Sequence, residues 1–402
     1  MYDGYLALGG IEVLNRARTA AYLQSLLRGR VEVKRDDAAL RTALGHGAYT
    51  SPDNAPWVTG GRAAGKRFLG LFPGSLLGAE DSTREITVTE LSGSGAVMTS
   101  PRYGSHEMRF VAVAYALDEE AMEEGMAWLK DVLSNEGCSD TTIGCTGREA
   151  KLFAGLPTTT ATATTLTRVF HRVETTEGPR VMKKYPTTSR GFVMWQIEFT
   201  LTAGIPWTFT TLSDVGSLNM DSASNFQDPA NEDCSSASDA YDTFVNDPYY
   251  TGISRPPRPP VILPPNILDI SSWRRLTLAL PGAQTQRWGR VVPVVHVSAL
   301  KAMQHLRLRF YQTGKSGCNF DGEFLVSYLP ANSTLTLDSI KREATLRLSS
   351  GKVVPAGHLL FGSDGRPFIW PTLGCQRSYT MAADLMPGQT GVVVLLQTAV
   401  RS

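Results

Sequence analysis

Four acidic residues come closest to a catalytic arrangement. Glu119, Glu120, Glu123 and Glu124 are spaced closely enough to resemble the paired carboxylates of a glycoside hydrolase. They also follow Asp118, a residue type that caps helices, and negative charge in a first helical turn is stabilised by the helix dipole. We favour this structural explanation over a hydrolytic site.

Neither a nucleotide site nor a metal site is indicated by residue spacing. Gly314-Lys315-Ser316 matches the end of a phosphate-binding loop, but the glycine required five positions earlier is Arg309 and no helix pattern follows. Cys138 and Cys145 are further apart than the cysteines of a zinc knuckle. The histidines form no metal-binding pattern. We therefore predict no catalytic, cofactor-binding or metal-ligating residues.

Three tryptophans in the last third of the chain are candidate carbohydrate-binding residues. Trp273, Trp288 and Trp370 have polar neighbours, and their rings could stack on a pyranose. Tryptophans in β-sandwiches more often belong to the core. Sugar binding therefore remains an alternative.

The overall composition excludes several classes of protein. The 402 residues carry 39 Lys and Arg against 38 Asp and Glu, for a formal charge of +1. This balance argues against a uniformly basic nucleic-acid coat and against a highly charged disordered chain. No apolar run approaches the roughly 20 residues that cross a bilayer, so we expect no membrane insertion. The five cysteines are too few for a disulfide framework.

Charge is distributed unevenly along the chain. Residues 213–254 contain eight acidic residues and no Lys or Arg, whereas residues 266–402 contain 15 basic and 7 acidic ones. Between them, residues 255–265 are rich in proline and favour polyproline II. We predict that residues 209–265 form an acidic, then Pro-rich connector between two domains, 1–208 and 266–402. We expect the connector acids to pair with basic residues of the last domain.

The first half of the chain combines short strand signals with two helices. A helix is predicted over residues 118–133, where the apolar residues recur on one face, and another over residues 15–27. Alternating polar and apolar residues predict strands at 85–91, 108–115, 151–156, 165–174 and 191–203.

The last third of the chain is predicted to consist of β-strands. Short alternating segments predict strands at 274–280, 291–297, 306–311, 323–329, 334–337, 343–348 and 392–397. Such spacing is typical of a β-sandwich or jelly roll. The fold class expected from the sequence is therefore mainly β with a few helices.

Three stretches resemble minor tail proteins of long-tailed phages that infect actinobacteria. These stretches are Leu8–Tyr22, Val173–Val181 and Glu198–Pro206. The order of strand, helix and further strands is similar to the first domain of distal tail proteins, and the resemblance covers residues 1–208 best.

The resemblance implies a structural role in the virion. It implies a β-sandwich or split barrel plus a helix in the first domain, and a galectin-like or jelly-roll sandwich in the last. Distal tail proteins form a homohexameric ring that joins the tail tube to the tail tip, which implies no enzymatic activity and no cofactor. The implied partners are other copies, the tail tube protein, the tape measure protein and the tip or baseplate hub protein.

In such a ring DNA passes through without specific binding, and the protein belongs to the tail tip after assembly in the host cytoplasm. A host-surface carbohydrate-binding tail component remains the alternative, followed by a cell-wall glycosidase. Ring assembly also has a physical counterpart, because strand edges exposed in one copy are paired when copies associate.

Overall fold

The computed structural model describes most of the chain outside the acidic segment. The described residues are 1–26, 35–44, 55–58, 63–81, 84–134, 147–155, 166–185, 191–225, 274–280, 289–314, 320–362 and 368–401, apart from residues 91, 93, 100, 101, 369, 375, 376 and 387.

The chain divides into two compact units, the first comprising residues 1–140 and 144–211 and the second beginning at Leu212. Strands predominate in both units and the described α-helices lie in the first, which confirms the fold class expected from the sequence.

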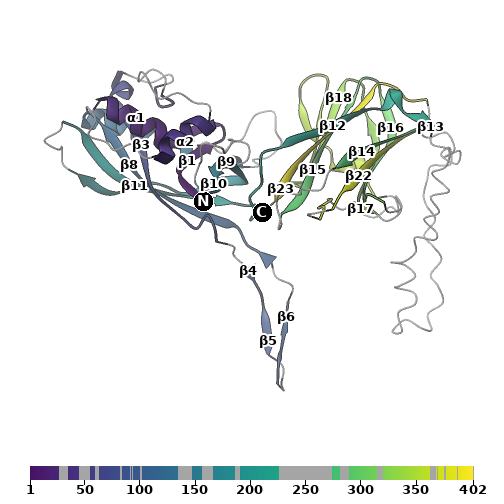
Figure 1. Ribbon diagram of the computed structural model, residues 1–402, viewed down its shortest axis with the longest axis horizontal. Coiled ribbons are helices and arrows are strands. Elements are labelled where there is room, and N and C mark those ends of the chain that lie inside the picture. The colour runs from purple at the N-terminus through teal and green to yellow at the C-terminus, as the bar shows by residue number, and fades with distance from the viewer. Residues whose placement is uncertain are drawn as a thin grey trace. The chain divides into compact units, whose positions relative to one another are not determined.

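A seven-stranded antiparallel sheet forms the first unit, in the order β2-β1-β9-β10-β11-β8-β3 (Figure 1). The strands are β1 (Tyr2–Leu8), β2 (Ile11–Asn15), β3 (Phe68–Leu77), β8 (His106–Ala116), β9 (Arg148–Phe153), β10 (Thr167–Tyr185) and β11 (Val193–Ala203). Strands β1 and β2 also contact β3 at the opposite end of the order. The sheet therefore curls into an open barrel, consistent with the split barrel expected for this domain.

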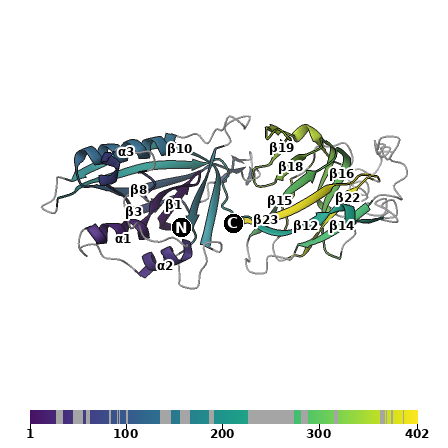
Figure 2. The ribbon, with the colours of Figure 1, turned by 90° about the horizontal axis from the view of Figure 1, so that it is seen from above.

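The helices of the first unit are α1 (Arg16–Leu26), α2 (Arg35–Leu44) and α3 (Glu119–Ser134), with a short 3₁₀ helix η2 (Ala63–Arg67). Helices α1 and α3 cover one face of the sheet, whereas Leu40 of α2 packs in a separate cluster with Tyr5 and Phe153. Helices α1 and α3 share one apolar core with the odd-numbered side chains of β11, such as Ile197 and Phe199. Figure 2 shows α1 beside β3 and α3 beside β10. The backbone nitrogen of Ala121 donates a 2.9 Å hydrogen bond to Asp118 Oδ1, so Asp118 caps α3 as its sequence indicates.

The C-terminal end of α3 is capped by a buried arginine. Arg148 Nη2 donates to the carbonyl of Leu133 at 2.9 Å, and Nη1 donates to the carbonyl of Val132. Thr175 Oγ1 donates to the same Leu133 carbonyl at 2.8 Å. These contacts satisfy carbonyls that have no partner within the helix and fix α3 against β9 and β10.

An arm separates β3 from β8. Residues 78–105 contain two small two-stranded sheets, one of β4 (Arg84–Glu85) with β7 (Arg102–Tyr103) and one of β5 (Val88–Glu90) with β6 (Ala96–Met98). The strand predicted over 85–91 is therefore broken between these two sheets and does not join the main sheet. Figure 1 shows the arm extending away from the sheet on the side opposite α1.

The second unit consists of two six-stranded antiparallel sheets around one core, which matches the predicted sandwich. One sheet contains β12 (Ser213–Asn219), β23 (Val392–Arg401), β15 (Arg290–Ala299), β18 (Ser333–Asp338), β19 (Glu343–Arg347) and β20 (Val353–Pro355), in that order. The other contains β13 (Ser224–Asn225), β14 (Arg274–Leu280), β22 (Tyr379–Leu385), β16 (Met303–Gln312), β17 (Phe320–Leu329) and β21 (Leu360–Phe361). Two 3₁₀ helices, η3 (Met220–Ser222) and η6 (Gly357–Leu359), complete the unit.

The structure places the first described residues of the predicted connector within the second unit. Residues 213–225 already belong to the sandwich, because β12 pairs with β23 and β13 pairs with β14. Asn225 and Arg274 are direct partners in the β13–β14 register. The chain therefore leaves the described residues at Asn225 and returns at Arg274 on the same sheet edge. The proline-rich residues 255–265 lie outside the described residues.

Candidate functional site

Four strands of the first unit continue beyond the rest of the sheet as a ribbon, β10-β11-β8-β3. One row across this ribbon consists of Arg180, Glu198, Val111 and Ser75, one residue from each strand. Each pair of neighbouring strands is antiparallel. Because the number of strands is even, the two outer strands, β10 and β3, run in opposite directions.

The outer edge of β10 is open over half its length. Strand β9 pairs with β10 only from Thr167 to Val173. From Glu174 to Tyr185, β10 pairs with β11 alone among the described residues. The side chains from Thr176 to Lys184 are mostly exposed. This edge therefore offers backbone donors and acceptors for another strand.

The edge of β3 is closed in its first half and open in its second. Trp57 Nε1 donates to the carbonyl of Phe68 at 2.9 Å, and Thr19 Oγ1 donates to the carbonyl of Leu71 at 3.3 Å. Residues 74–77 are exposed or partly exposed and, within the described part of the chain, pair only with β8. The ribbon thus has an open segment on each of its two edges.

The ribbon face opposite the helices is polar and charged. Glu198 accepts from Arg109 Nη2 at 2.7 Å and from Arg180 Nη2 at 3.3 Å, and its own side chain is buried beneath them. The hydrogen bond from Arg109, acting against burial and together with the two positive charges, lowers the pKa of Glu198. Thr200 on the same face donates to Glu177 at 3.1 Å. Glu198 on this face is thus bound by two arginines, and Glu177 accepts from a threonine.

A groove lies beside the open edge of β10. It has a volume of about 850 Å³ and is lined by residues from the end of α3 and from β10. These residues are Lys130, Leu133, Ser134, Glu174, Thr175, Gly178 and Pro179. The space next to this edge is therefore not filled by the described part of the same chain.

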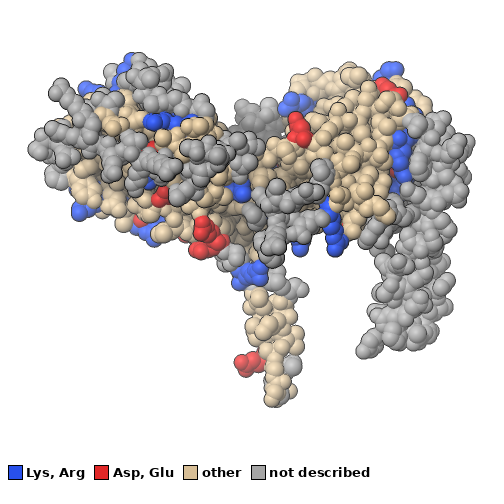
Figure 3. Space-filling view, in the orientation of Figure 1, with Lys and Arg blue, Asp and Glu red and all other residues tan. Residues whose placement is uncertain are grey.

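The arm exposes large apolar side chains. Ile86, Val88 and Met98 are 46%, 52% and 67% exposed, and Val88 is the direct partner of Met98 across the β5–β6 pair. In Figure 3 most of the described surface of the arm is uncharged. A free two-stranded hairpin is at best marginally stable in water, so an apolar arm of this kind indicates a contact surface.

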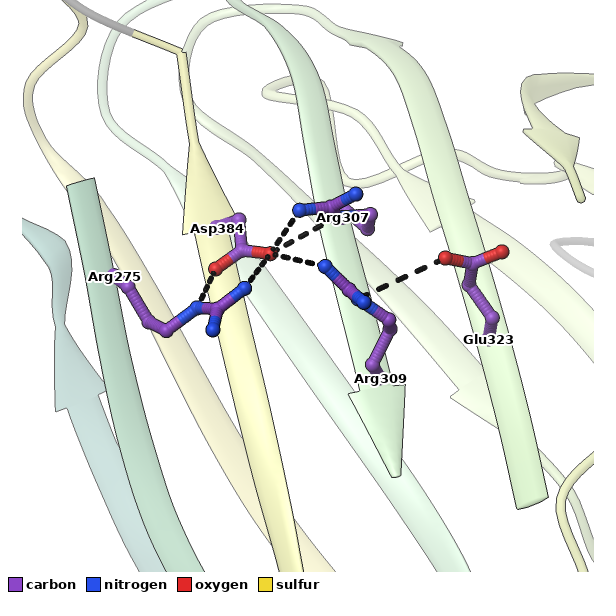
Figure 4. A network of polar contacts seen from close by, with 5 residues as sticks. All are labelled: Arg275, Arg307, Arg309, Glu323 and Asp384. Carbon is purple, nitrogen blue, oxygen red and sulfur yellow. Dashed lines mark hydrogen bonds and ion pairs between the residues drawn. The ribbon is translucent and has the colours of Figure 1, made fainter. Parts of the chain in front are cut away.

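A charged cluster lies on the sheet of the second unit that contains β14, β22, β16 and β17 (Figure 4). Arg275 Nε donates to Asp384 Oδ1 at 2.5 Å, Arg307 Nε donates to Oδ2 at 2.9 Å, and Arg309 Nη2 donates to Oδ2 at 3.5 Å. Glu323 lies 3.8 Å from Arg309 Nε. Burial alone would raise the pKa of Asp384, but these arginines lower it below its usual value. The cluster ties β14, β22, β16 and β17 together.

Two of the three candidate carbohydrate-binding residues, Trp273 and Trp288, lie outside the described residues. Trp370 packs against Phe324 and Phe368, with ring centroids 5.6 and 5.1 Å away, and is partly buried at the edge of the core. Carbohydrate binding stays a prediction.

The other residues considered for chemistry are not brought together in the described part of the chain. The four glutamates lie in the first turns of α3, where Glu120 and the cap Asp118 pair with Arg67. The cysteines lie outside the described residues. No group of three His, Cys, Asp or Glu among the described residues could hold a metal ion, and no described helix is long and apolar enough to cross a membrane.

Two of the eight connector acids are described. Asp214 accepts from Gln397 Nε2 at 2.7 Å, and Asp221 accepts from the backbone nitrogen of Gly391 at 2.8 Å. These contacts hold β12 and η3 onto the sandwich. The other six acids lie outside the described residues, so their pairing with basic residues stays a prediction.

No family model matches this chain, and no curated protein matches it. Among solved structures it is similar to the Dit protein of phage SPP1, described as a paradigm of the hub adsorption apparatus in phages that infect Gram-positive bacteria, with 10% identity, a TM-score of 0.40, and 82% of this chain and 92% of that chain covered.

It is also similar to a chain of the phage P2 baseplate in its activated conformation with Ca, with 9% identity, a TM-score of 0.38 and coverage of 80% and 92%. The phage p2 baseplate with Sr gives 7% identity, a TM-score of 0.36 and the same coverage. Sequence identities and TM-scores this low do not support a function. The strand edges and the arm are the features of this chain that bear on its function.

Proposed function

We propose that this protein is a structural component of a phage tail that assembles with copies of itself into a closed ring at the tail tip. Two observations support the proposal: the sequence resembles phage tail proteins over residues 1–208, and the four-stranded ribbon has an open segment on each edge. The second observation carries it, because it supplies a mode of assembly.

The direction of the two open edges favours a ring. In a ring the copies are related by rotation about one axis, so strands that run along the axis keep their direction from copy to copy. Strand β10 of one copy then meets β3 of the next with opposite direction, since the two run oppositely within each copy. The junction is therefore antiparallel like every other pair in the ribbon.

Such a contact joins two different surfaces, and head-to-tail contacts of this kind generate rings when the rotation closes. A pairing of β10 with β10 of a second copy would also be antiparallel, but it would leave the open segment of β3 unpaired. We propose that the helices lie outside the ring and the polar face of the ribbon lies inside, since the outer circumference has more room for α1 and α3.

The arm follows directly from the open segment of β3, because Gly78 succeeds Leu77. We propose that the arm extends the same junction and covers its apolar side chains against the neighbouring copy. The ring would join the tail tube protein to the tip or baseplate hub protein, with the tape measure protein and DNA inside it, and would need no catalytic residue.

The apolar arm supplies the test. In the triple variant Ile86→Thr, Val88→Thr and Met98→Thr, threonine retains strand propensity while apolar area is lost. A buried apolar side chain contributes about 1.5–3 kcal/mol, so the association between copies should weaken by at least about tenfold. Light scattering across a concentration series measures the mass.

The matched control carries Leu300→Thr, Phe320→Thr and Phe361→Thr, three exposed apolar residues of the second unit. We expect the control to keep the mass of the natural protein. An arm variant that assembles like the control would contradict the role of the arm, and a natural protein that stays at 43.7 kDa at every concentration would contradict the ring itself.

A further inference from the structure

The arm is joined to the sheet at one narrow place, formed by Gly78–Asp81 and His106, which we call the arm root. Gly78 has φ of 81° and ends β3, and a side chain there would clash with the carbonyl oxygen of Glu107. The backbone nitrogen of Asp81 donates to the carbonyl of Gly78 at 3.0 Å. The two ends of the arm are therefore in close contact where β3 ends and β8 begins.

His106 lies inside this root. It is only 6% exposed, and its ring packs against Phe170 of β10 with the centroids 5.0 Å apart. The carbonyls of Ala79 and Gly78 lie close enough to the imidazole to affect its pKa. Nε2 is buried and has no hydrogen-bond partner among the described residues, so we assign the donated proton to Nδ1. The neutral ring thus connects the first residues of the arm to the first residue of β8.

Protonation would change this arrangement unfavourably. A second N–H, on Nε2, would be buried without an acceptor among the described residues, and an unsatisfied buried donor is costly. Burial lowers the pKa of His106, although the backbone carbonyls and the charge of Asp81 oppose the shift. The charged or titratable side chains on the elements around the ring are Glu80 and Asp81 of the arm root, Glu107 of β8, and Arg168, His171 and Arg172 of β10. Glu80 forms an ion pair with the amino group of Met1 at the start of the chain.

We propose that His106 is an acid-sensitive latch for the arm: the neutral imidazole holds the arm root closed against β8, and its protonation opens the root and frees the arm. The latch acts within one chain, so it can be measured whether or not copies assemble. Because the pKa of His106 is lowered in the closed root, the neutral ring stabilises the closed root fully above the ordinary pKa of histidine, near 6.5. This stabilisation is lost as the pH falls below that value.

Hydrogen exchange of the full-length protein tests the latch. Peptides covering residues 75–81 and 102–110 are compared between pH 7.5 and pH 5, after correction for the intrinsic effect of pH on exchange. We expect their protection to fall on acidification, by up to about tenfold for each pKa unit by which the closed root depresses the imidazole. Peptides of β11 should keep their protection.

In His106→Asn the amide can replace the Nδ1 donor and does not titrate, so protection of the root should no longer depend on pH. His358→Asn, which removes an exposed imidazole from the second unit, should behave as the natural protein. An unchanged acid response in His106→Asn would overturn the proposal. If that variant fails to fold, the natural protein still decides the question, because a root that stays protected down to pH 5 would also overturn it.

Discussion

Asp384 is the residue at which the arginines of the second unit converge. Its carboxylate lies on β22 between Arg275 of β14 and Arg307 of β16, which are its direct cross-strand partners. Both partners and Arg309 donate hydrogen bonds to it, and it is almost fully buried. Removing this carboxylate should destabilise the second unit strongly, because the positive charges of the surrounding arginines would no longer be compensated.

We expect Asp384→Ala to lower the free energy of unfolding of the second unit by about 3–5 kcal/mol. The exposed Asp214→Asn, which leaves an acceptor for Gln397, should change it by less than about 0.5 kcal/mol. Urea unfolding followed by tryptophan fluorescence measures both variants. Equal effects of the two substitutions would show that the cluster contributes nothing special to stability.

The same carboxylate predicts a dependence on pH. Its pKa is lower in the folded protein than the ordinary value near 3.9, so the unfolded chain binds its proton first. The stabilisation is therefore complete above about pH 4 and is lost as the pH falls through the lowered pKa of the folded state. The difference between the natural protein and Asp384→Ala should shrink between pH 7 and pH 2.5. A constant difference would contradict this reading.

At the scale of elements, the β13–β14 pair changes the interpretation of the acidic segment. Asn225 and Arg274 are neighbours in register, so the 48 residues between them begin and end at one place. A two-residue Asn-Gly turn can close such a hairpin.

We expect that replacing residues 226–273 by Asn-Gly leaves the second unit folded, with a melting temperature within a few degrees of the natural protein. Circular dichroism and calorimetry measure this. Loss of the sandwich in the shortened chain would contradict this expectation, because it would show that residues 226–273 are needed for the core of the second unit.

The sequence predicted the elements whose signals are local. Helix α3 combines a cap at Asp118, acidic first turns and an apolar face, and it lies within one residue of its predicted bounds. Strand β14 was predicted over the same residues that form it. The signals for α3 and β14 come from residues that are close in sequence, and this is why sequence patterns predict these two elements.

Strands with interrupted patterns were missed. Strand β3 contains Gly70, Pro73 and Gly74, which read as turn residues, yet it lies at a sheet edge where proline is tolerated. Strand β22 contains Asp384, whose charge is compensated only by residues on other strands. The open edges of β10 and β3 and the return of the chain to β14 depend on pairing between distant residues. A single sequence does not display such pairing.

At the scale of the whole molecule, the two units should differ in their ability to assemble. The first unit has its own core and contains the ribbon and the arm, and the second has a separate core. We expect residues 1–211 to assemble as the full chain does and residues 212–402 to be monomeric. Sedimentation of the two fragments measures this, and an assembling second unit with a monomeric first unit would reverse our assignment of the contacts.

The ring itself is tested most directly by electron microscopy of the purified full-length protein. We expect class averages of closed rings with rotational symmetry about a central opening, built from copies joined head to tail. Single 43.7 kDa particles at every concentration, or pairs of copies related by a twofold axis, would contradict the pairing of β10 with β3 from which the proposed function is argued.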